Sequence, residues 1–182
     1  MRERIYVPPI YLKEDEPVVF LAGPIQGASD WHIKAMEIFK ELSPELNIAS
    51  PKRPDFTKEF DPSYEEEGNK FIGKSNVTYD QQVNWETDHL NKAANNGVVM
   101  FWLDKEEYHI CDRAYAQTTR FELAEWKVKH EYEGTKLAVG IHPEFPGRRY
   151  IKMRLTDDCP NIPVVNSLRQ TCEEVIKLLN KD

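Results

Sequence analysis

The sequence predicts an α/β protein: a single doubly wound domain built on a mainly parallel sheet of about five strands. The first observation is three continuous apolar runs, at residues 18–22, 98–103 and 137–141. Strands buried on both faces of a parallel sheet show such runs instead of polar alternation. The second observation is that segments with helical spacing alternate with these runs, which predicts right-handed crossovers that cover both faces. A chain of 182 residues has room for one such domain.

The N-terminal third is predicted to hold an arm, a strand, a helix and a second strand. These segments occupy residues 1–16, 18–22, 31–42 and 47–50 in that order. Gly23 and Pro24 stop the first strand, and Ser29 and Asp30 are candidate caps for the helix, whose apolar residues recur at helical spacing. Because the arm is polar, we expect the domain itself to span residues 17–182.

Residues 51–80 combine prolines, glycines and an acidic run without a sustained period, which predicts a long loop. Loops of this length inside a compact domain are usually functional or disordered. The elements predicted after it are a helix, a strand, a helix, a strand, a short strand and a helix, at residues 81–96, 98–103, 119–131, 137–141, 162–165 and 168–179. Gly97 and Gly134 end the first two of these helices, and Phe121, Ala124 and Val128 are expected on one side of the second.

Composition excludes several function classes. Twenty-four basic and thirty-one acidic residues give a net charge of −7, which opposes a nucleic-acid polymer as partner but permits a small anionic ligand. The apolar runs are far shorter than the roughly 20 residues that cross a membrane, and no leader opens the sequence, so we expect a cytoplasmic protein. Cys111, Cys159 and Cys172 follow no disulfide framework, and His109-x-Cys111 lacks a second ligand pair, so no metal site is expected.

Ligands of doubly wound sheets bind beyond the carboxyl ends of the strands, where the strand order reverses. The first segment expected there is Phe20 to Gly27, in which Gly23 and Gly27 would let a ligand approach the backbone closely. The alternative is a tight strand-to-helix turn without a ligand. The segment is neither a GxGxxG fingerprint nor a P-loop.

The second segment is the helix around residues 82–89. Helical geometry places Gln82, Glu86 and His89 on one side, whereas Asp88 points away from Glu86. The alternative is a solvated helix face with Trp85 as its anchor.

The third segment holds Thr119-x-x-Glu122, which has the form of a capping box, in which the glutamate only satisfies the start of a helix. The functional interpretation places Glu122 in the first helical turn above a strand end. Backbone amides and the helix dipole would then keep its carboxylate ionised, as a nucleophile requires.

Together these segments resemble the nucleoside 2-deoxyribosyltransferase family, in its divergent branch. The matching features are the Phe-Leu-Ala-Gly-Pro turn, the Gln-x-x-Asn-Trp-Glu helix, the Val-Met-Phe-Trp strand and the Thr-Thr-Arg-Phe-Glu-Leu segment, in the family's order over roughly residues 18–141. The resemblance implies a flavodoxin-like, three-layer domain that needs no cofactor. It also implies a homo-oligomer in which a neighbouring subunit helps to complete each site, and a role in purine and pyrimidine salvage.

The resemblance puts the nucleophile that attacks the anomeric carbon of a 2′-deoxynucleoside on Glu122. Glu86 is the candidate for binding the base edge or handling its proton, which requires a raised pKa. Two positions depart from the family pattern: Ala124 replaces a glycine, and Phe20 replaces a tyrosine whose hydroxyl touches the nucleophile. These departures imply either weak activity or another group that orients Glu122.

The remaining candidates are substrate-binding residues from all three segments and the strand between them. They are Phe20, Gly23, Pro24, Gln82, Trp85, Asp88, Trp102, Thr119 and Arg120. Trp102 would stack on the nucleobase, with a core tryptophan as the alternative, and Arg120 would orient charge, with a plain surface residue as the alternative.

Three functions are compatible with these residues. The first is a transferase that moves 2-deoxyribose between nucleobases through a glycosyl-glutamate intermediate, with nucleosides, nucleotides and free bases as its ligands. The second is an N-glycosidase that hydrolyses deoxynucleosides or their 5′-monophosphates, and the third is a non-catalytic nucleotide-binding module.

Overall fold

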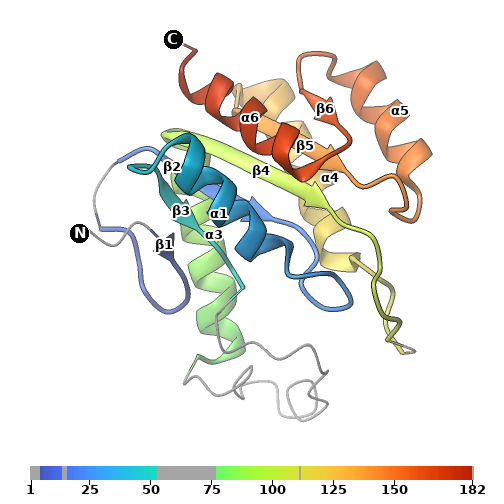
Figure 1. The fold of residues 1–182 in the computed structure, drawn as a ribbon, viewed down its shortest axis with the longest axis horizontal. Coiled ribbons are helices and arrows are strands. Elements are labelled where there is room, and N and C mark those ends of the chain that lie inside the picture. The colour runs from blue at the N-terminus through green and yellow to red at the C-terminus, as the bar shows by residue number, and fades with distance from the viewer. Residues whose placement is uncertain (1–4, 14–15, 53–76, 111, 182) are drawn as a thin grey trace.

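The computed structural model describes residues 5–13, 16–52, 77–110 and 112–181. Its centre is a six-stranded sheet in the order β1-β3-β2-β4-β5-β6, with every neighbouring pair parallel (Figure 1). The strands are β1 (Ile5–Tyr6), β2 (Val18–Ala22), β3 (Asn47–Ala49), β4 (Gly97–Leu103), β5 (Leu137–Ile141) and β6 (Val164–Val165). The α/β prediction is confirmed, with one strand more than expected.

Five helices of the described residues cover the two faces of this sheet. They are α1 (Trp31–Leu42), α3 (Tyr79–Asn95), α4 (Gln117–Glu133), α5 (Arg148–Asp158) and α6 (Leu168–Leu179). Helices α1 and α6 lie on one face, and α3, α4 and α5 lie on the other (Figure 1). Alternate residues of each strand build the two cores: Phe20 packs toward α3 and α4, whereas Leu21 packs toward α1. This arrangement is the three-layer, flavodoxin-like fold.

The strand order reverses at β2. From β2 the chain runs through α1 to β3 on one side, and then through α3 to β4 on the other side of β2. Because β2 and β4 are parallel neighbours, with Ala22 paired to Phe101, their carboxyl ends lie at the same edge of the sheet. This edge is the switch point at which a doubly wound fold opens a crevice for a ligand.

Part of the predicted arm belongs to the sheet. Ile5 and Tyr6 pair with Ile48 and Ala49, so the described N-terminal residues add the edge strand β1. A strand of two residues leaves no recognisable hydrophobic period, which is why the sequence did not reveal it. The prediction of a long loop at 51–80 falls mostly on residues 53–76, which lie outside the described residues, and its last two residues begin α3.

Helix α5 was not predicted, because among its residues only Leu155 is buried and no apolar stripe marks it. The prediction that Gly97 follows the helix end is confirmed, since α3 ends at Asn95 with Asn96 as its C-cap, and Gly97 is at the same time the first residue of β4. A Cβ atom on Gly97 would lie 1.9 Å from the carbonyl oxygen of Val18, so the glycine permits close approach of β2. No helix in the described part of the chain is long and apolar enough to cross a membrane.

Candidate active site

A cavity of about 750 Å³ opens beyond the carboxyl end of β2, between α3 and α4. Three parts of the chain that lie far apart in sequence supply its walls. Its lining includes Phe20, Gly23, Pro24, Gln82, Glu86, Thr119 and Glu122. The volume lies within the range that holds a small molecule of nucleoside size. The structure therefore brings together seven of the residues selected from the sequence.

The turn after β2 lines the cavity and packs closely against Trp31 and Trp102. The indole nitrogen of Trp31 donates to the carbonyl oxygen of Pro24 at 2.8 Å. A Cβ atom on Gly23 would lie 2.4 Å from the carbonyl oxygen of Trp102 and 2.6 Å from the Trp31 ring. The glycine is therefore required for packing of the turn, whatever occupies the cavity.

Helix α3 supplies one wall. It begins with a capping box, in which the Thr78 hydroxyl accepts from the Gln81 amide and the Gln81 side chain accepts from the Thr78 amide. One turn further on, Gln82 and Glu86 share a face because they are four residues apart. The side-chain nitrogen of Gln82 donates to Oε1 of Glu86 at 2.7 Å and to the carbonyl oxygen of Pro51 at 3.0 Å.

Helix α4 supplies the opposite wall, and two predictions about its start were wrong. The helix begins at Gln117, after Ala116 in the left-handed conformation, so Thr119 lies inside the helix and is no cap. Glu122 is consequently in the second turn, beyond the reach of the amides that flank a helix start. Thr119 is buried and lines the cavity beside Glu122.

The two glutamates form an acidic pair in a poorly solvated site. Burial, reinforced by the negative charges of Glu86 and Glu125, raises the pKa of Glu122 to about 8. Burial also raises the pKa of Glu86, although the hydrogen bond from Gln82 opposes that shift. The expectation that backbone amides keep Glu122 ionised was therefore wrong in direction. Such a pair favours one proton shared between two carboxyls, which provides an acid and a nucleophile in the same site.

A family model described as "Nucleoside 2-deoxyribosyltransferase like" matches residues 16–132, which is more than half of the sequence. The chain belongs to the nucleoside 2-deoxyribosyltransferase-like family. No curated protein matches it. The match runs from the residues before β2 to the last turn of α4, so it includes all three parts of the chain that form the cavity of this family member.

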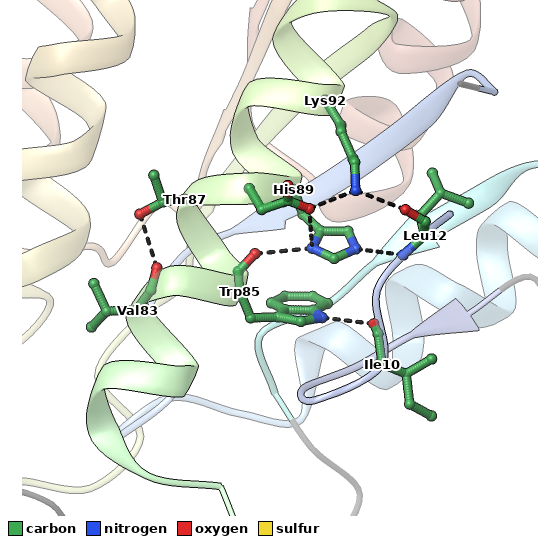
Figure 2. A network of polar contacts seen from close by, with 8 residues as sticks. Ile10, Leu12, Val83, Trp85, Thr87, His89 and Lys92 are labelled. Atoms are coloured by element: carbon green, nitrogen blue, oxygen red, sulfur yellow. Dashed lines mark hydrogen bonds and ion pairs between the residues drawn. The ribbon is translucent and has the colours of Figure 1, made fainter. Parts of the chain in front are cut away.

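Trp85 and Asp88 do not line the cavity. Figure 2 shows that Trp85 and His89 instead face Ile10 and Leu12 of the N-terminal segment. Trp85 is fully buried, stacks on His89 with 4.0 Å between ring centroids, and donates from its indole nitrogen to the carbonyl oxygen of Ile10 at 2.7 Å. Asp88 binds Lys92 at 2.6 Å, and Lys92 also donates to the carbonyl oxygen of Leu12 at 2.7 Å. Both residues therefore hold the N-terminal segment against α3.

His89 also belongs to this network and not to the site. Its Nε2 accepts from the Leu12 amide at 3.1 Å, so the ring proton resides on Nδ1, which donates to the carbonyl oxygen of Trp85 at 2.9 Å. Burial lowers the pKa of His89 and so favours this neutral form. The sequence had placed His89 beside Glu86, but in the structure the His89 ring packs against the N-terminal segment at Leu12.

Trp102 and Arg120 lie outside the lining as well. Trp102 is 3% exposed in the core on the α1 and α6 face, because β4 alternates its side chains between the two faces. Arg120 donates to the carbonyl oxygen of Pro146 at 2.7 Å, and its guanidinium lies 4.7 Å from the ring centroid of Phe145. Arg120 therefore braces the loop after β5. Trp102 is not placed to stack on a base in the cavity, and Arg120 is not placed to orient charge there.

The sequence misassigned the apolar side of α4. Phe121, Ala124 and Val128 were expected to form its apolar side, yet Phe121 is 76% exposed at the rim of the cavity, and the buried residues are Thr119, Leu123 and Trp126. The helix carries two apolar stripes, and periodicity alone does not say which one faces the sheet. The spacing from Leu123 to Trp126 was the available signal for the buried one.

Among the residues that the structure describes, no group of three or more metal-ligating side chains is present. Cys159 and Cys172 are buried free thiols, whereas Cys111 lies outside the described residues.

The Glu122→Gln variant is expected to unfold at a higher temperature than the wild type near pH 8. The native pKa of about 8 exceeds the unfolded value of 4.5, so ionisation destabilises the native state progressively as pH rises from 4.5 to 8. Allowing for partial solvent access, the gain should be about 2 kcal/mol, or roughly 4–8 °C. Thermal melts at pH 8 and pH 4 measure it, and a gain that is equally large at pH 4 would contradict the assignment.

Proposed function

We propose that this protein transfers 2-deoxyribose between nucleobases through a covalent ester on Glu122. The observation that carries the proposal is the pair of glutamates, Glu122 and Glu86, which come from two different helices and line one cavity of nucleoside size. Membership of the deoxyribosyltransferase-like family supports the substrate class. Nucleosides and free nucleobases are accordingly the proposed ligands.

The reaction needs one carboxylate and one carboxylic acid, so it proceeds from the form of the pair in which Glu122 is ionised and the shared proton lies on Glu86. The Glu122 carboxylate attacks the anomeric carbon, an oxygen–carbon bond forms, and the carbon–nitrogen bond to the base breaks. Glu86 gives its proton to the departing base, which leaves as a neutral molecule. A second base then reverses these steps: its ring nitrogen attacks the ester carbon, Glu122 leaves as a carboxylate, and Glu86 recovers a proton from the incoming base.

Three residues of the lining support this chemistry without taking part in bond changes. Phe20 and Pro24 offer apolar surface for the flat faces of sugar and base, and Thr119 lies on the same wall as Glu122. Phe20 has no hydroxyl to orient the nucleophile. The other glutamate, the acid Glu86, is oriented by Gln82, which donates directly to it.

Nucleosides are favoured over their 5′-monophosphates. A phosphate site at the first turn would need free hydroxyl and amide donors. The hydroxyl and the backbone amide of Ser29 both donate to the carboxylate of Asp104, and that carboxylate would repel a phosphate. Both donors of Ser29 are therefore committed to a negative group of the protein itself.

A 2-fluoro-2-deoxyarabinosyl nucleoside, supplied without an acceptor base, is expected to trap the ester. Fluorine destabilises the cation-like transition states of both steps, so the intermediate accumulates if water enters slowly. Intact mass spectrometry should show one added fluorosugar per chain, and peptide mapping should place it within residues 119–126. Addition of adenine should discharge it.

Other outcomes of this experiment separate the alternatives. Turnover to free sugar with inverted configuration and without any adduct would favour a hydrolase that uses water directly. A label on another carboxylate would move the nucleophile away from Glu122. Neither an adduct nor turnover, with tight nucleoside binding, would favour a non-catalytic binding module.

We also propose that α4 lies at an interface between copies of this chain. Val128 and Tyr132 are 49% and 78% exposed, and their stripe continues to Phe121 at the rim of the cavity. The double substitution Val128→Glu and Tyr132→Glu is expected to yield monomers by light scattering, because buried unpaired carboxylates oppose association. Tyr150→Glu on α5, where the tyrosine is similarly exposed, is the matched control. Wild-type protein that is already monomeric would contradict the proposal.

A further inference from the structure

Gln82 has a buried side-chain acceptor that no group in the described part of the chain uses. The residue is 6% exposed and lines the cavity from α3. Its Oε1 atom has no hydrogen-bond partner among the residues that the structure describes. Among the described lining residues it is the one with a buried, unpaired side-chain polar atom, and buried acceptors are rarely left so.

The orientation of the amide is determined by its neighbours. The carbonyl oxygen of Pro51, at 3.0 Å, has no hydrogen to give, so the nitrogen of Gln82 must face it. The second amide hydrogen is donated to Glu86 at 2.7 Å. Both hydrogens are thus used, and a rotation of the amide by 180° would bring two acceptors together at Pro51. Oε1 of Gln82 is therefore left as an acceptor to which a ligand can donate.

Gln82 and Glu86 together present an acceptor next to an acid. Oε1 of Glu86 accepts the hydrogen bond from the Gln82 amide nitrogen. The Glu86 carboxyl group can also carry a proton for the departing base. The group that complements this pair is a ring nitrogen that accepts a proton, placed beside an amino group that donates. Adenine offers this edge at N7 and its 6-amino group, and cytosine offers it at N3 and its 4-amino group.

We propose that Gln82 and Glu86 select nucleobases with an amino group next to an unprotonated ring nitrogen over their oxo counterparts. The inference rests on the proposed function and names its substrate class. In hypoxanthine or uracil a carbonyl oxygen replaces the amino group. That oxygen would face Oε1 of Gln82, acceptor against acceptor, and the buried atom would stay unpaired. Sites built to bind a donor discriminate strongly against analogues that lack it.

The kinetic test compares amino and oxo substrates in one preparation of the full chain. Deoxyadenosine should exceed deoxyinosine in kcat/KM by at least about tenfold, and deoxycytidine should exceed deoxyuridine similarly. Gln82→Met keeps the length of the side chain but removes its acceptor, so both ratios should fall to about one. A partly unfolded variant does not distort a ratio of two substrates. Gln170→Met, on the exposed surface of α6, should leave both ratios unchanged.

A binding test separates this inference from the proposed reaction. Titration calorimetry with adenine and with hypoxanthine needs no turnover. A preference for adenine of about tenfold or more that Gln82→Met abolishes would support the selection even if no sugar transfer were found. Equal affinity for the two bases in the wild type, affinity for neither, or a preference that survives Gln82→Met would overturn it, even in an active transferase.

Discussion

Glu122→Gln is expected to lower the rate of base exchange at least about a thousandfold, because an amide cannot form the glycosyl ester that the reaction requires. The substitution keeps the shape of the side chain and removes a carboxyl that burial makes unfavourable to ionise. A loss of activity therefore cannot be attributed to unfolding if the melting temperature is maintained or raised. Chromatography of free bases and nucleosides at saturating substrate measures the rate.

The matched control for this prediction is Glu131→Gln, an identical change at an exposed position of the same helix. It should retain activity within about twofold, since a surface glutamate contributes little to folding or to the distant cavity. If Glu122→Gln retained more than about a tenth of the wild-type rate, the assignment of the nucleophile would be wrong.

Trp85→Ala is expected to lower the free energy of unfolding by about 3–5 kcal/mol, which corresponds to a fall of roughly 10 °C in melting temperature. The indole is fully buried between Phe20 and His89 and is hydrogen-bonded to the carbonyl oxygen of Ile10. Its removal leaves a cavity in the core and an unpaired carbonyl in the N-terminal segment. Chemical denaturation followed by circular dichroism measures the loss.

Two further substitutions test the cause of that loss. Trp85→Phe preserves most of the packing but removes the donor, so it should cost about 1–3 kcal/mol. Val83→Ala, at an exposed position of the same helix, should change stability by no more than about 0.5 kcal/mol. A Trp85→Ala protein as stable as Val83→Ala would show that the N-terminal segment is not anchored by the indole.

Much of the fold could be predicted because three strands are apolar along their whole length. Continuous runs mark strands that are covered on both faces, and they lie where β2, β4 and β5 were found. Helix α5 escaped detection because it buries only Leu155, and β1 because two residues show no period. Such elements are determined by tertiary contacts that a local pattern does not contain.

The parts of the candidate site that depend only on helical geometry could be predicted from the sequence. Gln82 and Glu86 are four residues apart, so they share a face wherever the helix packs. Which side of an element faces a cavity is a different question, and the sequence does not answer it for Trp85 or Trp102. An apolar side chain suits both a core and a base-stacking site, and only the packing of the sheet separates the two.

The N-terminal segment has a practical consequence for anyone who trims this chain to its recognised domain. The family match begins at residue 16, whereas the sheet begins at Ile5. A chain that starts at residue 16 would lack β1 and so expose the edge of β3. It would also lack Ile10 and Leu12, which are hydrogen-bonded to Trp85 and His89. An exposed strand edge invites self-association and aggregation. A synthetic peptide covering the lost residues should bind back to the shortened protein and restore its solubility.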